Sequence, residues 1–228
     1  MVFDPMYFVF MLPAIALVMF AQFRVKRTFA KYSNVANDHR ITGAQVAAEI
    51  LRANGLHDVP IEHIKGELSD HYDPRSRTLR LSDSVYGSTS VAAMGVAAHE
   101  VGHALQHAHG YVPLKIRSSI VPVASFGSNL GPIMVIMGVI LNVTGLAWAG
   151  VIAFALGTLF ALVTLPVEFN ASSRAMVQLS NLGLVDRTEY GQARSVLNAA
   201  ALTYIAAFAA ALLNLLYYIS LVSGRSRD

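Results

Sequence analysis

Three long stretches of this chain are rich in apolar residues and contain no charged side chain. They cover residues 5–23, 118–167 and 195–224. A helix that crosses a membrane needs roughly 20 apolar residues, so the first and third stretches each fit one span and the second fits two. A polar turn near residues 141–145 divides the second stretch. We therefore predict four spans, at residues 5–23, 120–141, 146–165 and 199–221.

The first stretch has an alternative interpretation as a secretory signal peptide. Such a peptide begins with basic residues and ends at a cleavage site of small residues, and the sequence around residues 5–23 shows neither feature. Pro13 within the stretch is compatible with a membrane helix. We therefore interpret it as a retained membrane anchor.

The composition agrees with a membrane protein. Of 228 residues, 54% are hydrophobic and 14% are charged, whereas soluble domains carry about 25% charged residues. The length allows one domain or two small ones, and we treat residues 1–228 as a single membrane domain. Because the chain has no cysteine, disulfides and thiolate metal sites are excluded, and any metal ion would be held by His and carboxylates. The net charge is only +3, and we expect no nucleic-acid partner.

The basic residues indicate an orientation in the membrane. Of the 17 Lys and Arg, 12 lie between Arg24 and Arg117, with a cluster directly after the first span. An excess of basic residues is typical of cytoplasmic loops, so we predict that residues 24–117 and 166–198 are both cytoplasmic and that the N-terminus is outside. The chain is thus predicted to be a multi-pass protein of the cell (inner or plasma) membrane.

The cytoplasmic segment 24–117 has the pattern of a small α+β fold. Thr42 precedes an amphipathic run that Gly55 ends, which is typical of a capped helix. Residues 59–64 and 78–82 alternate between polar and apolar and predict a β-hairpin with a long loop. The predicted fold is therefore mainly α, with about four transmembrane helices and a small cytoplasmic α+β segment that carries a zincin-type helix.

That zincin-type helix is expected to begin at Ser88 or Thr89 and to end at Gly110, and it contains His99-Glu100-Val101-Gly102-His103. Residues four apart share one face of a helix, so both imidazoles can bind one zinc ion. Zinc lowers the pKa of bound water to about 7, and the Glu beside the first His can take the proton of that water as it attacks a carbonyl. Accidental spacing of the histidines is the alternative, but the helical context favours a zinc site.

A catalytic zinc ion needs a third protein ligand, and the sequence offers three candidates. Glu168 follows the third span and returns to the side of the two histidines. His109 has the spacing of H-E-x-x-H-x-x-G-x-x-H proteases, but Gln106 replaces the glycine, and a continuous helix would direct His109 about 80° away. His107 would lie about 12 Å from His99 along the helix axis. We favour Glu168; the alternatives are a Glu solvated by lipid headgroups and one of the two histidines as ligand.

Several other side chains are candidates for stabilising the oxyanion of peptide hydrolysis. They are His71, Tyr72, Tyr86 and Arg174. On a helix, Arg174 would point about 120° away from Glu168, and each of the four has an alternative role in the hairpin or at the lipid headgroups. The strand at 78–82 is a candidate for pairing with an extended peptide substrate.

Four blocks of the sequence resemble the YugP-like membrane-bound neutral zinc metallopeptidases of bacteria, and the resemblance covers most of the chain. The blocks are Asp70–Pro74, Leu79–Ser82, Ala97–His107 and Pro166–Ser172. The resemblance implies a membrane zinc peptidase with Zn²⁺ as its cofactor.

More distantly, the order of H-E-x-x-H, two spans and Glu-Phe-x-Ala is similar to the HtpX-like and CAAX-prenyl membrane proteases, in which that Glu is the third zinc ligand. This resemblance implies Glu168 as a ligand. The distant relatives carry Asp four residues after the Glu, where this chain has Ser172. In the relatives this position can orient a ligand histidine. In this chain we expect that role to be weaker at Ser172 or to be carried by Asn170.

The expected function is that of a zinc-dependent endopeptidase. We expect His99, His103 and Glu168 to bind Zn²⁺ and Glu100 to act as general base. Peptides or membrane proteins near the cytoplasmic membrane surface are the expected substrates, and the lipid bilayer is the expected surrounding. The alternative is a non-catalytic membrane binding or scaffold protein with a structural or vestigial zinc site. Glu100 argues against that alternative, because a structural site needs no base.

Overall fold

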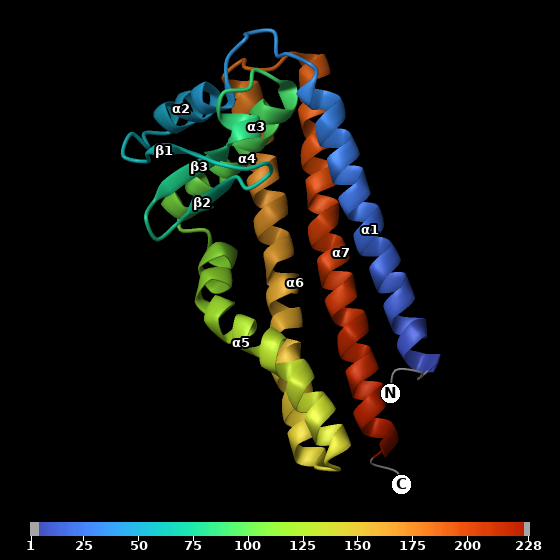
Figure 1. The fold of residues 1–228 in the computed structure, drawn as a ribbon. Coiled ribbons are helices and arrows are strands. Elements are labelled where there is room, and N and C mark those ends of the chain that lie inside the picture. The colour runs from blue at the N-terminus through green and yellow to red at the C-terminus, as the bar shows by residue number, and fades with distance from the viewer. Residues whose placement is uncertain (1–4, 226–228) are drawn as a thin grey trace. The chain divides into compact units, whose positions relative to one another are not determined.

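The computed structural model of the chain describes residues 5–225. Within them the protein is mainly helical, with one small sheet (Figure 1). In chain order the elements are α1 (Pro5–Ser33), α2 (Gly43–Ala53), β1 (Ile61–Ile64), β2 (His71–Asp73), β3 (Thr78–Ser82), α3 (Asp83–Tyr86), α4 (Val91–Ala108), α5 (Val112–Ile140), α6 (Thr144–Asn181) and α7 (Arg187–Arg225). The predicted fold class, mainly helical with about four helices able to span a membrane and a small sheet, is confirmed.

Four helices in this range, α1, α5, α6 and α7, are long and apolar enough to cross a membrane. Many of their large apolar side chains are exposed, among them Val9 at 62%, Phe126 at 64% and Ile152 at 64%. In water such exposure is unfavourable, whereas in a bilayer these side chains contact lipid. The four predicted spans therefore coincide with helices of suitable length and composition.

Each of these helices extends beyond its predicted span. α1 continues to Ser33, α5 begins at Val112, α6 continues to Asn181 and α7 begins at Arg187. The span prediction depended on hydropathy, which indicates the part of a helix that lies inside the bilayer but not where the helix ends. Many polar residues continue a helix as well as apolar ones do, so a helix can extend beyond its apolar part. The segment 166–198, expected as a loop, is therefore largely helical, and only residues 182–186 lie outside a helix.

Contacts divide the chain into two compact units. The first combines α1 up to Gln22, Lys115–Pro166, and α7 from Leu202 onward. The second combines Phe23–Leu114 with Val167–Ala201. Every side chain of the candidate site described below belongs to the second unit. The single domain over residues 1–228 stays a prediction.

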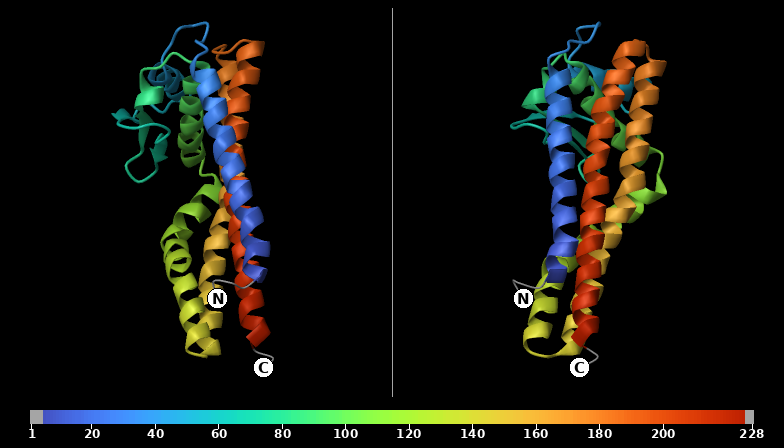
Figure 2. Two further views of the ribbon diagram at one scale, coloured as in Figure 1. Left: turned by 45° about the vertical axis from the view of Figure 1, so that its right-hand side comes forward. Right: turned by 90° about the vertical axis from the view of Figure 1, so that its right-hand side faces the viewer.

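Glycines let α5 and α6 approach each other closely in the first unit. A Cβ atom at Gly131 would lie 2.8 Å from the backbone N of Phe154, and one at Gly150 would lie 2.6 Å from the backbone N of Val135. Small residues at such positions are typical of membrane helix pairs, because they allow the two backbones to come together. Both views in Figure 2 draw the connected ends of α5 and α6 side by side. This contact agrees with the hairpin expected for the second and third spans.

In the second unit, α2 has the termini that the sequence predicts. The hydroxyl of Thr42 accepts a hydrogen bond from the N–H of Gln45, and the Gln45 side chain accepts one from the N–H of Thr42. Gly55 follows the helix with a φ of 72°, a conformation that glycine adopts without strain. Val46 and Ile50 of α2 are fully buried in a core that they share with Met94 of α4.

The helix α4 begins at Val91, two or three residues later than predicted. Ser90 caps it, accepting a hydrogen bond from the N–H of Ala93 at 3.1 Å. Thr89 instead holds the preceding chain, because its carbonyl accepts a hydrogen bond from the N–H of Asn37 at 2.8 Å. Ser88, Thr89 and Ser90 all have the side-chain hydroxyl that is typical of a helix N-cap. Tertiary contacts determine that Ser90 is the one that caps α4. Gly110 follows the helix end, with a φ of 64°.

The sheet differs from the predicted hairpin. Its strand order is β1-β3-β2, so that β1 pairs with β3 in parallel and β2 pairs with β3 in antiparallel orientation. The strands predicted to form a hairpin are therefore parallel neighbours, and the true hairpin joins β2 to β3. β3 is the central strand and both of its edges are occupied. The expectation that residues 78–82 pair with a peptide substrate is therefore wrong.

The β2–β3 turn explains why residues 71–73 form a strand. Asp73 accepts hydrogen bonds from the N–H of Arg75 at 2.9 Å and from the hydroxyl of Ser76 at 2.7 Å. These bonds lower the pKa of Asp73 to about 2, so the carboxylate stays charged at neutral pH. Arg77 then adopts a φ of 53°. Asp73, Arg75 and Ser76 thus close a tight hairpin within the segment that was predicted to be a long loop.

Candidate metal centre

Gly102 lets α4 pack closely against α6. A Cβ atom at this position would lie 2.5 Å from the carbonyl oxygen of Ala171, too close for any side chain. Gly102 lies between the two histidines of the H-E-x-x-H motif, and Ala171 lies one helical turn after Glu168. The glycine therefore allows Glu168 to approach His99 and His103.

His99, His103 and Glu168 form a cluster that could hold a metal ion. Their ligand atoms all lie within 4.8 Å of one another. Oε2 of Glu168 is 3.2 Å from Nε2 of His99 and 3.5 Å from Nε2 of His103. In a tetrahedral zinc site with bonds of about 2.0–2.1 Å, neighbouring ligand atoms lie about 3.3–3.4 Å apart. Two imidazoles and one carboxylate at these separations fit a zinc ion.

The cluster is buried, and the neighbouring carboxylates change the pKa of His103. His103 and Glu168 are 9% and 2% exposed. Burial lowers the pKa of His103, but the hydrogen bond to Glu168 and the negative charges of Glu100 and Glu168 outweigh burial and raise the pKa above its ordinary value. The carboxylates thus favour a positive charge at this position. A bound metal cation would supply that charge in place of a proton.

Both imidazoles are oriented by a hydrogen bond at Nδ1. Nδ1 of His99 is 3.1 Å from the hydroxyl of Ser172, and Nδ1 of His103 is 3.0 Å from Oε1 of Gln106. A partner that accepts a hydrogen bond from Nδ1, as Oε1 of Gln106 does, favours the tautomer that leaves Nε2 unprotonated and able to bind a metal. Of the two residues considered for this role, Ser172 thus contacts a candidate ligand histidine directly.

Gln106 connects His103 to α6, and it was not among the candidate site residues of the sequence analysis. It is fully buried, and its amide Nε2 donates to the carbonyl of Val167 at 2.7 Å and to Oδ1 of Asn170 at 3.0 Å. The same Oδ1 accepts a hydrogen bond from Nε of Arg174 at 2.8 Å. A chain of hydrogen bonds therefore links Arg174 and Asn170 to His103 through Gln106. Its position three residues after His103 was the available sequence signal.

We expect Gln106→Leu to weaken zinc binding roughly 10–100-fold, the usual cost of losing a partner that orients a ligand. The substitution removes the acceptor for Nδ1 of His103 and takes one hydrogen-bond donor away from the carbonyl of Val167 and one from Oδ1 of Asn170. Competition with a chelator of known affinity measures the change. Gln178→Leu is the control, because Gln178 also lies on α6 but bonds to Asn54. Equal zinc affinity in the two variants would show that Gln106 does not orient the site.

Glu100 lies beside the cluster on α4 and is 8% exposed. Its Oε2 accepts a hydrogen bond from the main-chain N–H of Tyr72 at 3.1 Å. Burial raises the pKa of Glu100 above its ordinary value, and the nearby imidazoles offset this only in part. A carboxylate with a raised pKa accepts a proton more readily, so Glu100 has the properties of a general base.

The two alternative ligand histidines have other partners. His109 occupies the C-cap of α4, and its Nδ1 donates to the carbonyl of Leu105 at 2.7 Å. His107 bonds through Nδ1 to the hydroxyl of Tyr72 at 2.8 Å. Glu168, and neither of these histidines, joins His99 and His103 in the cluster.

The remaining oxyanion candidates are distributed over β2, α3 and α6. His71 is exposed on β2, and its Nδ1 is 2.9 Å from the carbonyl of Ser69. The ring of Tyr86 packs against His63, with 5.0 Å between ring centroids. Arg174 lies over the ring of Tyr111, 5.9 Å from its centroid. Their part in oxyanion stabilisation stays a prediction, and Tyr72 is the member of this set that contacts Glu100.

The comparisons with known proteins agree with this donor set. The family model described as "Putative neutral zinc metallopeptidase" matches residues 7–223. The chain is 44% identical over 225 residues to the "Putative membrane protease YugP" of Bacillus subtilis (strain 168), and the match covers 98% of this chain and 100% of that protein. No solved structure matches the chain. Since the family model covers almost the whole sequence, the chain belongs to this neutral zinc metallopeptidase family.

Proposed function

We propose that the chain is a membrane-embedded zinc endopeptidase. The observation that carries the proposal is the convergence of His99, His103 and Glu168, with the buried carboxylate of Glu100 beside them. The family and the 44% identical membrane protease support it. Two histidines and a glutamate are a known catalytic zinc set, and an adjacent carboxylate supplies the base that peptide hydrolysis requires.

In this mechanism His99, His103 and Glu168 hold the metal. A zinc ion held there would act as a Lewis acid on the scissile carbonyl and make a water molecule acidic enough to attack at neutral pH. Glu100 accepts the proton of the attacking water and delivers it to the leaving amine. The N–H of Tyr72 holds Oε2 of Glu100 in place during this transfer.

The proposed reaction takes place near the cytoplasmic membrane surface. Glu168 follows the end of the third predicted span by three residues, Leu165 being the last residue of that span. The excess of Lys and Arg between Arg24 and Arg117 supports a cytoplasmic position for the part of the chain that contains His99 and His103. Membrane proteins and peptides released at that surface are the proposed substrates, and the lipid bilayer surrounds the four spans.

Single cysteines test the proposed orientation, because the natural chain contains none. Glu67→Cys lies in the exposed connection between β1 and β2, and Val143→Cys lies in the exposed turn between α5 and α6. In intact cells, a membrane-impermeant maleimide is expected to label Val143→Cys and to spare Glu67→Cys. After lysis both variants should react. The reverse pattern in intact cells would place the site outside.

Removal of the metal tests the proposed activity. Purified protein in detergent is expected to cleave casein, to lose this activity to background when a chelator removes the zinc, and to regain it when zinc is added back. The zinc content of each sample, measured by mass spectrometry, is expected to follow the activity. Cleavage that persists at full rate in metal-free protein would contradict the proposal.

A further inference from the structure

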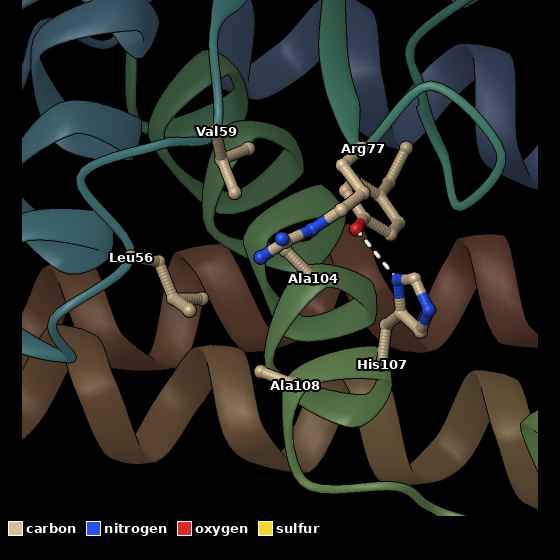
Figure 3. A pocket seen from close by; sticks show the side chains of 7 residues that line it. Leu56, Val59, Arg77, Ala104, His107 and Ala108 are labelled. Atoms are coloured by element: carbon tan, nitrogen blue, oxygen red, sulfur yellow. Dashed lines mark hydrogen bonds between the residues drawn. The ribbon is translucent and has the colours of Figure 1, made fainter.

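A pocket of about 300 Å³ lies beside α4 in the second unit (Figure 3). Three parts of the chain line it: the C-terminal half of α4, the connection from α2 to β1, and the β2–β3 hairpin. The lining residues are Leu56, Val59, Tyr72, Arg77, Ala104, His107 and Ala108. The volume is at the lower end of the range for ligand pockets, so it suits one side chain better than a cofactor.

Two residues connect this pocket to the proposed general base. Ala104 in the pocket wall follows Glu100 by four residues, so the two lie one above the other on the same face of α4. Tyr72 lines the pocket with its side chain, while its main-chain N–H donates to Oε2 of Glu100 at 3.1 Å. A peptide bound beside Glu100 can therefore place a neighbouring side chain in the pocket.

The walls of the pocket combine an apolar surface with a positive charge. Leu56, Val59, Ala104 and Ala108 supply the apolar part. In Figure 3 the side chain of Arg77 reaches across the pocket to a position beside Ala104. The hydroxyl of Tyr72 and Nδ1 of His107 bond to each other at 2.8 Å. Among the lining residues, Arg77 carries a permanent positive charge, so its guanidinium is the group that would pair with a negatively charged ligand.

Arg77 can pair with a second carboxylate without a large loss of free energy from its existing ion pair with Asp58. Its Nη1 is 2.9 Å from Oδ2 of Asp58, and the two side chains are 50% and 60% exposed. Such exposed pairs contribute little free energy, so the guanidinium can reorient or share its donors. A guanidinium has five N–H donors in a planar array that matches a carboxylate.

We propose that this pocket receives an acidic side chain of the peptide substrate, with Arg77 as the residue that selects it. The inference rests on the proposed peptidase function and adds a substrate class to it. A glutamate fits this site best, because its two methylene groups contact the apolar walls while its carboxylate pairs with the guanidinium.

Cleavage of a peptide library by the zinc-loaded protein in detergent tests this proposal. The peptides carry Glu, Gln or Lys at each position around the cleaved bond, and mass spectrometry gives the relative kcat/KM values. We expect the wild type to prefer Glu over Gln by at least about tenfold at one position. Arg77→Glu is expected to reverse the preference at that position in favour of Lys, and Arg77→Gln to remove it.

Arg75→Glu is the matched control, since Arg75 is an exposed residue of the same turn and is not among the pocket-lining residues. It should keep the wild-type preference, and Asp58→Asn should strengthen it by removing the competing carboxylate. Zinc content and thermal unfolding of each variant show that the fold is intact.

Two different failures can be told apart. If the wild type cleaves the library but Arg77→Gln retains its preference for Glu, the assignment of the pocket is wrong and the peptidase function stands. If the zinc-loaded wild type cleaves no peptide and no casein, the proposed function fails and the pocket assignment fails with it.

Discussion

Replacing Glu100 by Gln is expected to abolish peptide hydrolysis while zinc stays bound. The amide has nearly the same size, and its carbonyl oxygen can still accept the hydrogen bond from the N–H of Tyr72. It cannot take a proton from water, and loss of a general base typically lowers the rate by about 10²–10⁴-fold. Initial rates on casein-derived peptides, with the zinc content of the same samples, measure the effect.

Glu49→Gln is the control for this substitution. Glu49 lies on the exposed face of α2 and pairs with Arg52, so its loss should leave both the rate and the zinc content unchanged. Equal inertness of the wild type and Glu100→Gln, each with one zinc bound, would instead favour a scaffold protein with a structural zinc site. A fully active Glu100→Gln would remove Glu100 from the mechanism.

Glu168→Ala is expected to release the zinc ion. The substitution removes the carboxylate that lies 3.2 Å from His99 and 3.5 Å from His103, and two imidazoles alone leave a tetrahedral site incomplete. We expect the zinc affinity to fall by more than the roughly 10–100-fold that is typical for a partner outside the ligand set. Zinc per chain after dialysis, and competition with a chelator, give the size of the loss.

His109→Ala is the informative comparison for Glu168→Ala. His109 caps the end of α4 through the carbonyl of Leu105, so its loss should leave zinc bound and reduce the stability of the helix end only slightly. His107→Ala should also retain zinc, because His107 bonds to Tyr72. Zinc loss in His109→Ala together with zinc retention in Glu168→Ala would reverse the choice of the third ligand.

The third ligand shows how far a sequence argument can reach across the chain. Glu168 is 65 residues beyond His103 in the sequence, and no local pattern relates them. The spans between them, read as a hairpin, predicted that both return to one side of the membrane. That argument restricts the candidates for the third zinc ligand, but it does not show that Glu168 contacts the two histidines. The contact depends on Gly102, which removes the Cβ atom that would otherwise strike the backbone of α6.

The sheet shows the opposite case. Alternation of polar and apolar residues located the strands at 59–64 and 78–82 to within two residues, because the side chains of a strand point alternately to its two faces. Alternation carries no information about which strand is the neighbour. The interposed β2 forms because Asp73 closes the following turn, and its backbone then occupies the edge of β3 that a substrate was expected to use.

The hydrogen bonds around the two histidines were the least predictable part of the site. Ser172 was considered because it replaces an Asp of the distant relatives, with Asn170 as the alternative, whereas Gln106 was considered only as the replacement of a glycine. A glutamine on a helix is usually exposed, and nothing in the local sequence indicates that this one is fully buried. Its burial follows from the packing of α4 on α6, which also brings Val167 and Asn170 within reach of its amide.

The sequence by itself determined the membrane character of this protein, its four long helices and the pairing of His99 with His103, because hydropathy and helical period are properties of neighbouring residues. Only the tertiary structure decided the position of Glu168 beside both histidines, the role of Gln106, and the contact of Tyr72 with Glu100. These contacts join residues that are distant in the chain or hidden in its core. They depend on how closely two helix backbones approach each other and on which strand forms the edge of the sheet. Neither feature can be inferred from hydropathy or from the spacing of residues in the sequence.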